Sequence, residues 1–187
     1  MFLVLLALLL EPSGSVRTGP PELGRTTVTA LAGRPFWALQ VDHGVSDRLD
    51  AGLGLDFSSH GVLRPMGRLR GRLFQAGRFL VSLRGAAGVA LHTRRASFGN
   101  RLLVPSMDTE LAVSLDVPLA ARLAGFAEVG SLAVTDFSAE RSAAFGHGVA
   151  GVEWAPGAGV SLLARGGILQ GSRGRVATGS AGAAYRF

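Results

Sequence analysis

The segment LDAGLGLDF, residues 49–57, decides between the two regular structures open to this chain. Its odd positions hold Leu, Ala, Leu, Leu and Phe, whereas its even positions hold Asp, Gly, Gly and Asp. A helix would spread these two sets around its whole circumference, but an extended strand places them on opposite faces. The segment is therefore predicted to be a strand with one apolar and one polar face.

The same alternation recurs along the chain, for example in residues 109–117, where Leu and Val alternate with Glu110, Ser114 and Asp116. Leu132, Val134 and Leu163 depart from the pattern, and we expect a bulge near the first two to shift the register. Ten strands are predicted, at residues 25–33, 36–44, 49–58, 63–74, 78–92, 109–117, 121–135, 146–154, 158–168 and 175–187. If residues 25–44 do not form two strands, the count falls to eight.

Composition narrows the class of protein. The 187 residues are 48% hydrophobic with a mean hydropathy of +0.33, yet the longest apolar run, Met1 to Leu10, is shorter than the roughly 18 residues of a spanning helix. High hydrophobicity in alternation is what a transmembrane barrel requires. Cysteine is absent, which excludes disulfides and thiolate metal sites. All 19 basic residues are arginine, which we attribute to genome composition, and no nucleic-acid partner is predicted.

The N-terminus indicates export. The apolar run 1–10 has the length of a signal-peptide core, and residues 13–15 supply the small side chains of a cleavage site. We predict a signal peptide at 1–15, truncated at its N-terminus because no positive charge precedes the run; the alternative is a buried apolar helix. Residues 16–24 are predicted to be a flexible lead-in and residues 25–187 the barrel.

Connections of two lengths are expected to alternate. Tight turns are predicted at 46–48, 75–77, 118–120 and 156–157, and longer polar loops at 59–62, 93–108, 136–145 and 169–174. Short turns on one side and long loops on the other are typical of outer-membrane barrels.

The final segment TGSAGAAYRF, residues 178–187, places Tyr185 and Phe187 on an uncharged face that ends at the carboxyl terminus. This arrangement resembles the C-terminal assembly signal of bacterial outer-membrane β-barrels, and the segment 44–50 is similar to their periplasmic hairpins. The resemblance is to the small OmpA-type and opacity-type barrels. It implies an all-β, antiparallel up-and-down transmembrane barrel in the outer membrane of a Gram-negative bacterium, in contact with lipid and with the barrel-assembly machinery.

Aromatic residues support this interpretation. Most of the Phe, Trp and Tyr residues fall at or near predicted strand ends, where a membrane barrel has its interfacial girdles, and Phe126 is the main exception.

The polar faces would line the interior. The predicted charge network consists of Asp50, Asp56, Arg68, Arg70, Arg72, Arg84, Asp116, Glu128, Glu153 and Arg165. The inward set also includes Asp42, Arg64, Glu110, Arg122 and Arg186. Arginine–carboxylate pairs would make the interior rigid; the alternative is a water-filled constriction that favours anions.

No catalytic, cofactor or metal-binding residues are predicted, because the four histidines lack metal-ligand spacing. A rim-sited lipid hydrolase is the less favoured alternative, using His60 with Ser58 or Ser59, or His147 with Ser142 and Glu140. The arginine-rich loop 93–108 is a candidate for contact with lipopolysaccharide phosphates.

The sequence thus favours a non-enzymatic outer-membrane barrel with a structural or surface-interaction role. A narrow passive channel for small polar or anionic solutes is the first alternative. A secreted soluble β-sandwich, which would bury the same apolar faces between two sheets, is the second.

Overall fold

The computed structural model describes residues 22–34, 36–58, 62–77, 79–95, 101–137, 141–157, 159–172 and 174–187. The predicted signal peptide, 1–15, and most of the predicted lead-in, 16–24, lie outside the described residues. Among the residues described, there is no helix long and apolar enough to cross a membrane.

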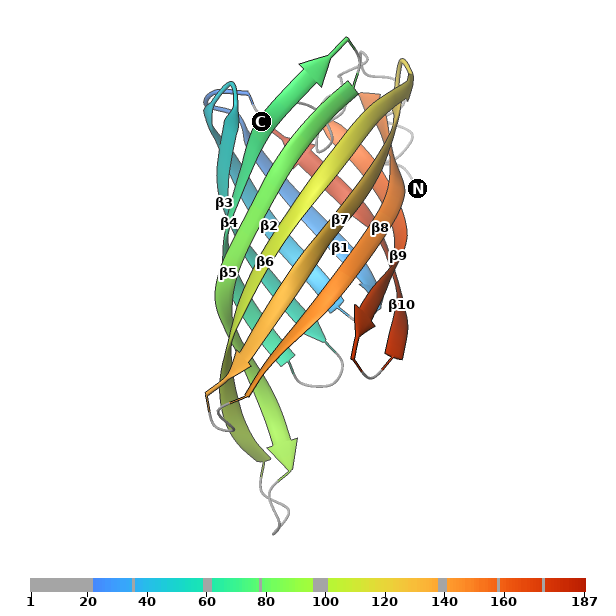
Figure 1. The fold of residues 1–187 in the computed structure, drawn as a ribbon. Coiled ribbons are helices and arrows are strands. Elements are labelled where there is room, and N and C mark those ends of the chain that lie inside the picture. The colour runs from blue at the N-terminus through green and yellow to red at the C-terminus, as the bar shows by residue number, and fades with distance from the viewer. Residues whose placement is uncertain are drawn as a thin grey trace, which may run out of the picture.

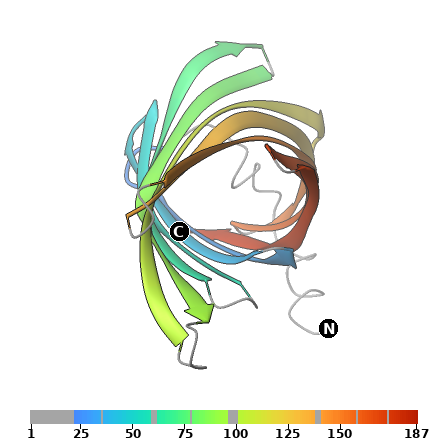
Figure 2. The ribbon, with the colours of Figure 1, turned by 60° about the horizontal axis from the view of Figure 1, so that its bottom comes forward.

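Ten strands form one closed barrel (Figures 1 and 2). Their bounds are β1 Thr26–Arg34, β2 Phe36–Ser46, β3 Leu49–Ser58, β4 Val62–Ala76, β5 Phe79–Arg95, β6 Arg101–Ala120, β7 Leu123–Asp136, β8 Arg141–Gly157, β9 Val160–Gly171 and β10 Gly174–Arg186. Each strand pairs antiparallel with its sequence neighbours, and β1 closes the barrel on β10, with Thr27 opposite Arg186. The predicted all-β, up-and-down barrel architecture is confirmed.

The count is ten because residues 25–44 do form two strands, the point on which the eight-strand alternative depended. Strands β1 and β2 pair from Thr26 opposite His43 to Leu31 opposite Ala38. The eight-strand alternative is therefore wrong.

The apolar faces point outward. Leu53 and Val129 are 71% and 65% exposed, whereas inward neighbours such as Ser82 are fully buried. Leu55, Val113 and Leu115 are exposed as well, although a sandwich would bury them between sheets. The soluble β-sandwich alternative is therefore wrong: the sheet closes on itself, and its interior is filled by the opposite face of each strand.

Two predicted long loops are largely strand. Strand β5 continues to Arg95 and β6 begins at Arg101, so most of 93–108 is a paired ladder, with Arg95 opposite Arg101. In the same way, β7 and β8 pair as far as Asp136 opposite Arg141, within the predicted loop 136–145. A two-stranded ladder satisfies backbone hydrogen bonds without burying side chains, so polar sequence does not end it. Consequently β5–β8 extend beyond the other strands at the lower end of the barrel in Figure 1, where the β5–β6 hairpin projects furthest.

The predicted bulge in β7 is also wrong. Its register runs unbroken from Leu123 opposite Trp154 to Asp136 opposite Arg141. Leu132 keeps its inward position and lines the interior instead. Leu163 is likewise inward, packed with Leu31, Ala38 and Ala184 in a small buried cluster. The register shifts that do occur, at 44–46, 72–74, 118–120 and 154–157, adjoin the short turns.

Aromatic pairs mark both ends of the barrel. The rings of Trp37 and Phe57 lie 5.8 Å apart at the end opposite the short turns, and those of Tyr185 and Phe187 lie 5.9 Å apart at the turn end. Phe126, the exception in the sequence, faces inward across from Gly151. A Cβ at Gly151 would come within 2.6 Å of the Phe126 ring, so the absent side chain leaves room for it.

Candidate functional site

The middle of the barrel interior contains a cluster centred on Arg84 of β5. Its Nη2 donates to Glu110 Oε1 at 2.7 Å and to Glu128 Oε1 at 2.6 Å. The register explains this fork: Arg84 lies opposite Ala112, and Ala112 lies opposite Gly130. Glu110, two residues from Ala112, is therefore the diagonal neighbour of Arg84 on β6. Glu128, two residues from Gly130, reaches Arg84 from β7, two strands away.

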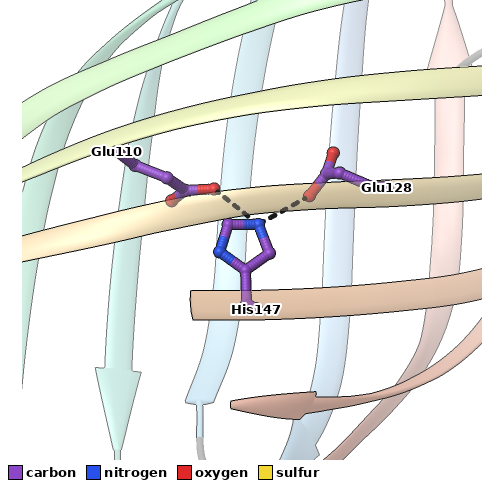
Figure 3. A group of neighbouring side chains, drawn as sticks. All are labelled: Glu110, Glu128 and His147. Atoms are coloured by element: carbon purple, nitrogen blue, oxygen red, sulfur yellow. Dashed lines mark ion pairs between the residues drawn. The ribbon is translucent and has the colours of Figure 1, made fainter. Parts of the chain in front are cut away.

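His147 of β8 completes the cluster (Figure 3). Its Nε2 lies 3.4 Å from Glu128 Oε1 and 3.8 Å from Glu110 Oε1. The imidazole lies beside Gly130, where a Cβ would come within 2.7 Å of its Cε1. When protonated, His147 adds a second positive charge to the two carboxylates.

The sequence-based grouping of His147 with Ser142 is wrong. The two lie five residues apart on β8 and therefore point to opposite faces of the sheet. Ser142 Oγ lies 3.3 Å from Thr135 Oγ1, whereas His147 is inside the barrel. Glu140, Ser59 and His60 lie outside the described residues.

Glu110, Glu128 and His147 also form a group that can be considered as a metal site, since their ligand atoms lie within 4.8 Å of one another. However, the same two Oε1 atoms accept hydrogen bonds from Arg84. A divalent cation would have to displace the guanidinium, so the geometry is that of an ion-pair cluster. The sequence did not predict the group because its members come from three strands and share no short motif.

Further ion pairs lie on either side of this cluster. Towards the loop end, Arg64 Nε donates to Asp56 Oδ2 at 3.2 Å, and Arg64 Nη1 lies 3.4 Å from Asp108 Oδ2. Towards the turn end, Arg70 Nε donates to Asp50 Oδ2 at 2.9 Å. Both arginines lie directly opposite their aspartates on β3. Asp108 was missed because the predicted loop 93–108 included it.

The other residues of the predicted charge network do not take part in the ion pairs described above. Asp116 and Glu153 are buried, with Glu153 fully so. Arg72 lies apart from the network: its Nη1 donates to Gln75 Oε1 at 2.9 Å beside the β4–β5 turn, where the register shifts. Arg68 and Arg165 have fewer partners: Arg68 Nη1 is 3.9 Å from Asp42 Oδ2, and Arg165 Nε donates to Ser180 Oγ at 2.7 Å.

Two cavities flank the middle of the barrel. The outer cavity, towards the loop end, has a volume of about 170 Å³, and the turn-side cavity has about 60 Å³. The residues that line both are Arg68, Arg84, Glu128, Val149 and Arg165. These five form a central layer that separates one cavity from the other.

Comparison with known proteins gives structural similarities alone. No protein-family model matches the chain, and no curated protein matches it. Among solved structures, the NanC porin is similar with a TM-score of 0.44 and 11% identity, over 86% of this chain and 98% of that one. The N-terminal β-barrel domain of Pseudomonas aeruginosa OprF has a TM-score of 0.35 and 9% identity, over 88% and 98%. The attachment invasion locus protein Ail of Yersinia pestis has a TM-score of 0.29 and 12% identity, over 89% and 100%.

Proposed function

We propose that this chain is a non-enzymatic β-barrel of a Gram-negative outer membrane, with a structural or surface-interaction role and a lumen that does not conduct. The membrane assignment depends on one observation, the apolar character of the outer surface. Large apolar side chains such as Leu53, Leu111 and Ile168 are exposed on every strand from β2 to β10. Exposed apolar area of this extent marks an interaction surface, and around a closed barrel its natural partner is lipid.

The closed lumen is inferred from the central layer. Arg84 of β5 donates two short hydrogen bonds, one to Glu110 of β6 and one to Glu128 of β7. His147 of β8 lies close to the same carboxylates. A barrel of this size has little room beyond its own side chains. Paired charges in that space hold their positions, because separating them would leave desolvated ions without partners.

The two ends of the barrel suggest the partners. Phe187 and Thr26 exchange backbone hydrogen bonds of 3.0 Å at the seam, and Tyr185 and Phe187 stay exposed on the outer face. The C-terminal strand is thus available to the barrel-assembly machinery before closure. At the other end, the projecting ladder of β5 and β6 is the candidate surface for contacts outside the membrane, including lipopolysaccharide at 93–108 (Figure 1).

The test is single-channel recording with the full barrel in planar lipid bilayers. We expect no openings above the baseline for the native chain. The triple variant Arg84→Ser, Glu110→Gln and Glu128→Gln removes the charges of the cluster and should conduct. Arg175→Gln is a matched control, since Arg175 is exposed and donates to Gln170 Oε1 outside the central layer. Steady openings of the native chain would instead favour the passive-channel alternative.

A further inference from the structure

Arg68 of β4 is a buried guanidinium with an incomplete set of partners. Its side chain is only 10% exposed, and its Nη1 is buried without a hydrogen-bond partner. Asp42 Oδ2, at 3.9 Å, is the one carboxylate oxygen within ion-pair distance among the described residues, and it is too far for a hydrogen bond. Arg68 therefore retains donor capacity in the interior.

Arg165 of β9 has the same character. Its Nε donates to Ser180 Oγ at 2.7 Å, and within the part of the chain that the structure describes it forms no ion pair. The sequence explains why: β1, β9 and β10 contain neither Asp nor Glu. Opposite and diagonal to Arg165, β10 places Ser180, Thr178 and Gly182, so most of the five N–H donors of the guanidinium remain available.

Both guanidiniums line the outer cavity, which also has an apolar part. Met66, Ala86 and Leu132 contribute to its lining. Leu132 is an inward leucine that breaks the alternation of β7, so the apolar part of the wall comes from a departure from the barrel pattern. A cavity of about 170 Å³ is similar in size to the cavities of about 150 Å³ that bind benzene, a ligand of about six non-hydrogen atoms.

We propose that the outer cavity binds a small aliphatic carboxylate, with its carboxylate on Arg68 and Arg165 and its short chain against Met66 and Leu132. A carboxylate matches the planar donor fork of arginine. It also supplies a negative charge that β9 and β10 lack. The apolar part of the lining favours a ligand with a hydrocarbon portion over a fully hydrated inorganic anion.

Butyrate, with six non-hydrogen atoms, is the probe of choice. Isothermal titration calorimetry on the full barrel in detergent micelles should give one site per chain. Arg68→Gln and Arg165→Gln should each weaken binding by about tenfold or more. Arg175→Gln, the matched exposed arginine, should leave binding unchanged. Heat-modifiable migration on gels shows that each variant is folded, so a loss of binding is not a loss of structure.

The proposal is overturned if butyrate gives no saturable heat at about 10 mM, or if both lumen variants bind as the native chain does. The ligand class has its own test: acetate should bind more weakly than butyrate, and Leu132→Asn should reduce that difference. Inorganic phosphate binding as tightly as butyrate would overturn the carboxylate assignment. The site does not require a closed lumen, so a native chain that conducts and still binds butyrate would reject only the proposed closure.

Discussion

The interior of the barrel has two contrasting walls. The acidic wall, β2–β8, carries carboxylates such as Asp50, Glu110 and Glu128, and its Arg70 and Arg84 form short ion pairs with them. The bare wall, β9, β10 and β1, has no Asp or Glu in its strands, and among the described residues its Arg165 makes a hydrogen bond to Ser180 alone. The partners of a lumen arginine are thus set by the nearest strands: Arg84 of β5, for example, pairs with Glu110 of β6 and with Glu128 of β7, two strands away.

The largest expected difference between the walls lies in the removal of an arginine. Arg84→Ala leaves Glu110 and Glu128 close together without their shared cation. We expect the free energy of unfolding to fall by about 3 kcal/mol, the lower end of the cost of breaking a buried pair, since the lumen is partly accessible. Arg165→Ala, on the bare wall, should cost less than about 1 kcal/mol. Urea unfolding in lipid vesicles, followed by heat-modifiable migration, measures both.

Equal losses in the two variants would contradict the distinction between the walls. Arg84→Ala combined with Glu110→Gln and Glu128→Gln provides the internal control. It should recover much of the lost stability, because no unpaired carboxylate remains in the cluster.

The second prediction tests whether the acidic and bare walls differ only on their inner faces. Val129 and Ala164 lie mid-strand on the outer faces of the acidic and bare walls, and both are exposed. Replacing either by Arg would place a charge in lipid, so we expect a loss of about 2 kcal/mol in each case. The same vesicle unfolding assay applies. If either substitution had no cost, that face would not lie in the hydrocarbon region.

The smallest effect comes from giving the bare wall a carboxylate. Ser180→Asp places an acid beside Arg165, and we expect a gain of about 1 kcal/mol in the free energy of unfolding. The substitution should also weaken butyrate binding, since Arg165 would already be paired.

A double-mutant cycle sharpens this last prediction. In the Arg165→Gln background, Ser180→Asp should destabilise, because the new carboxylate then has no cation beside it. The same gain in both backgrounds would show that Arg165 is not the partner.

The sequence predicted much of the fold and part of the site. Alternation in segments such as 49–57 indicated the strands and their outward faces, and the ten-strand count followed from it. The extent of β5 and β6 was missed, because ladders beyond the membrane need no apolar face. The contact of His147 with Glu128 was not predicted, because the two residues lie on different strands and share no motif. Asp108, which pairs with Arg64, was missed because it fell within the predicted loop 93–108.

By itself, the sequence determined which side of the sheet each residue occupies, because successive side chains on a strand point to opposite faces. Only the tertiary structure decided which inward residues meet. The pairing of Arg84 with Glu110 and Glu128 depends on the register of three strands, and a shift of one residue would turn those side chains outward. Closure likewise brings Arg68 of β4 and Arg165 of β9, which are distant in sequence, to one cavity.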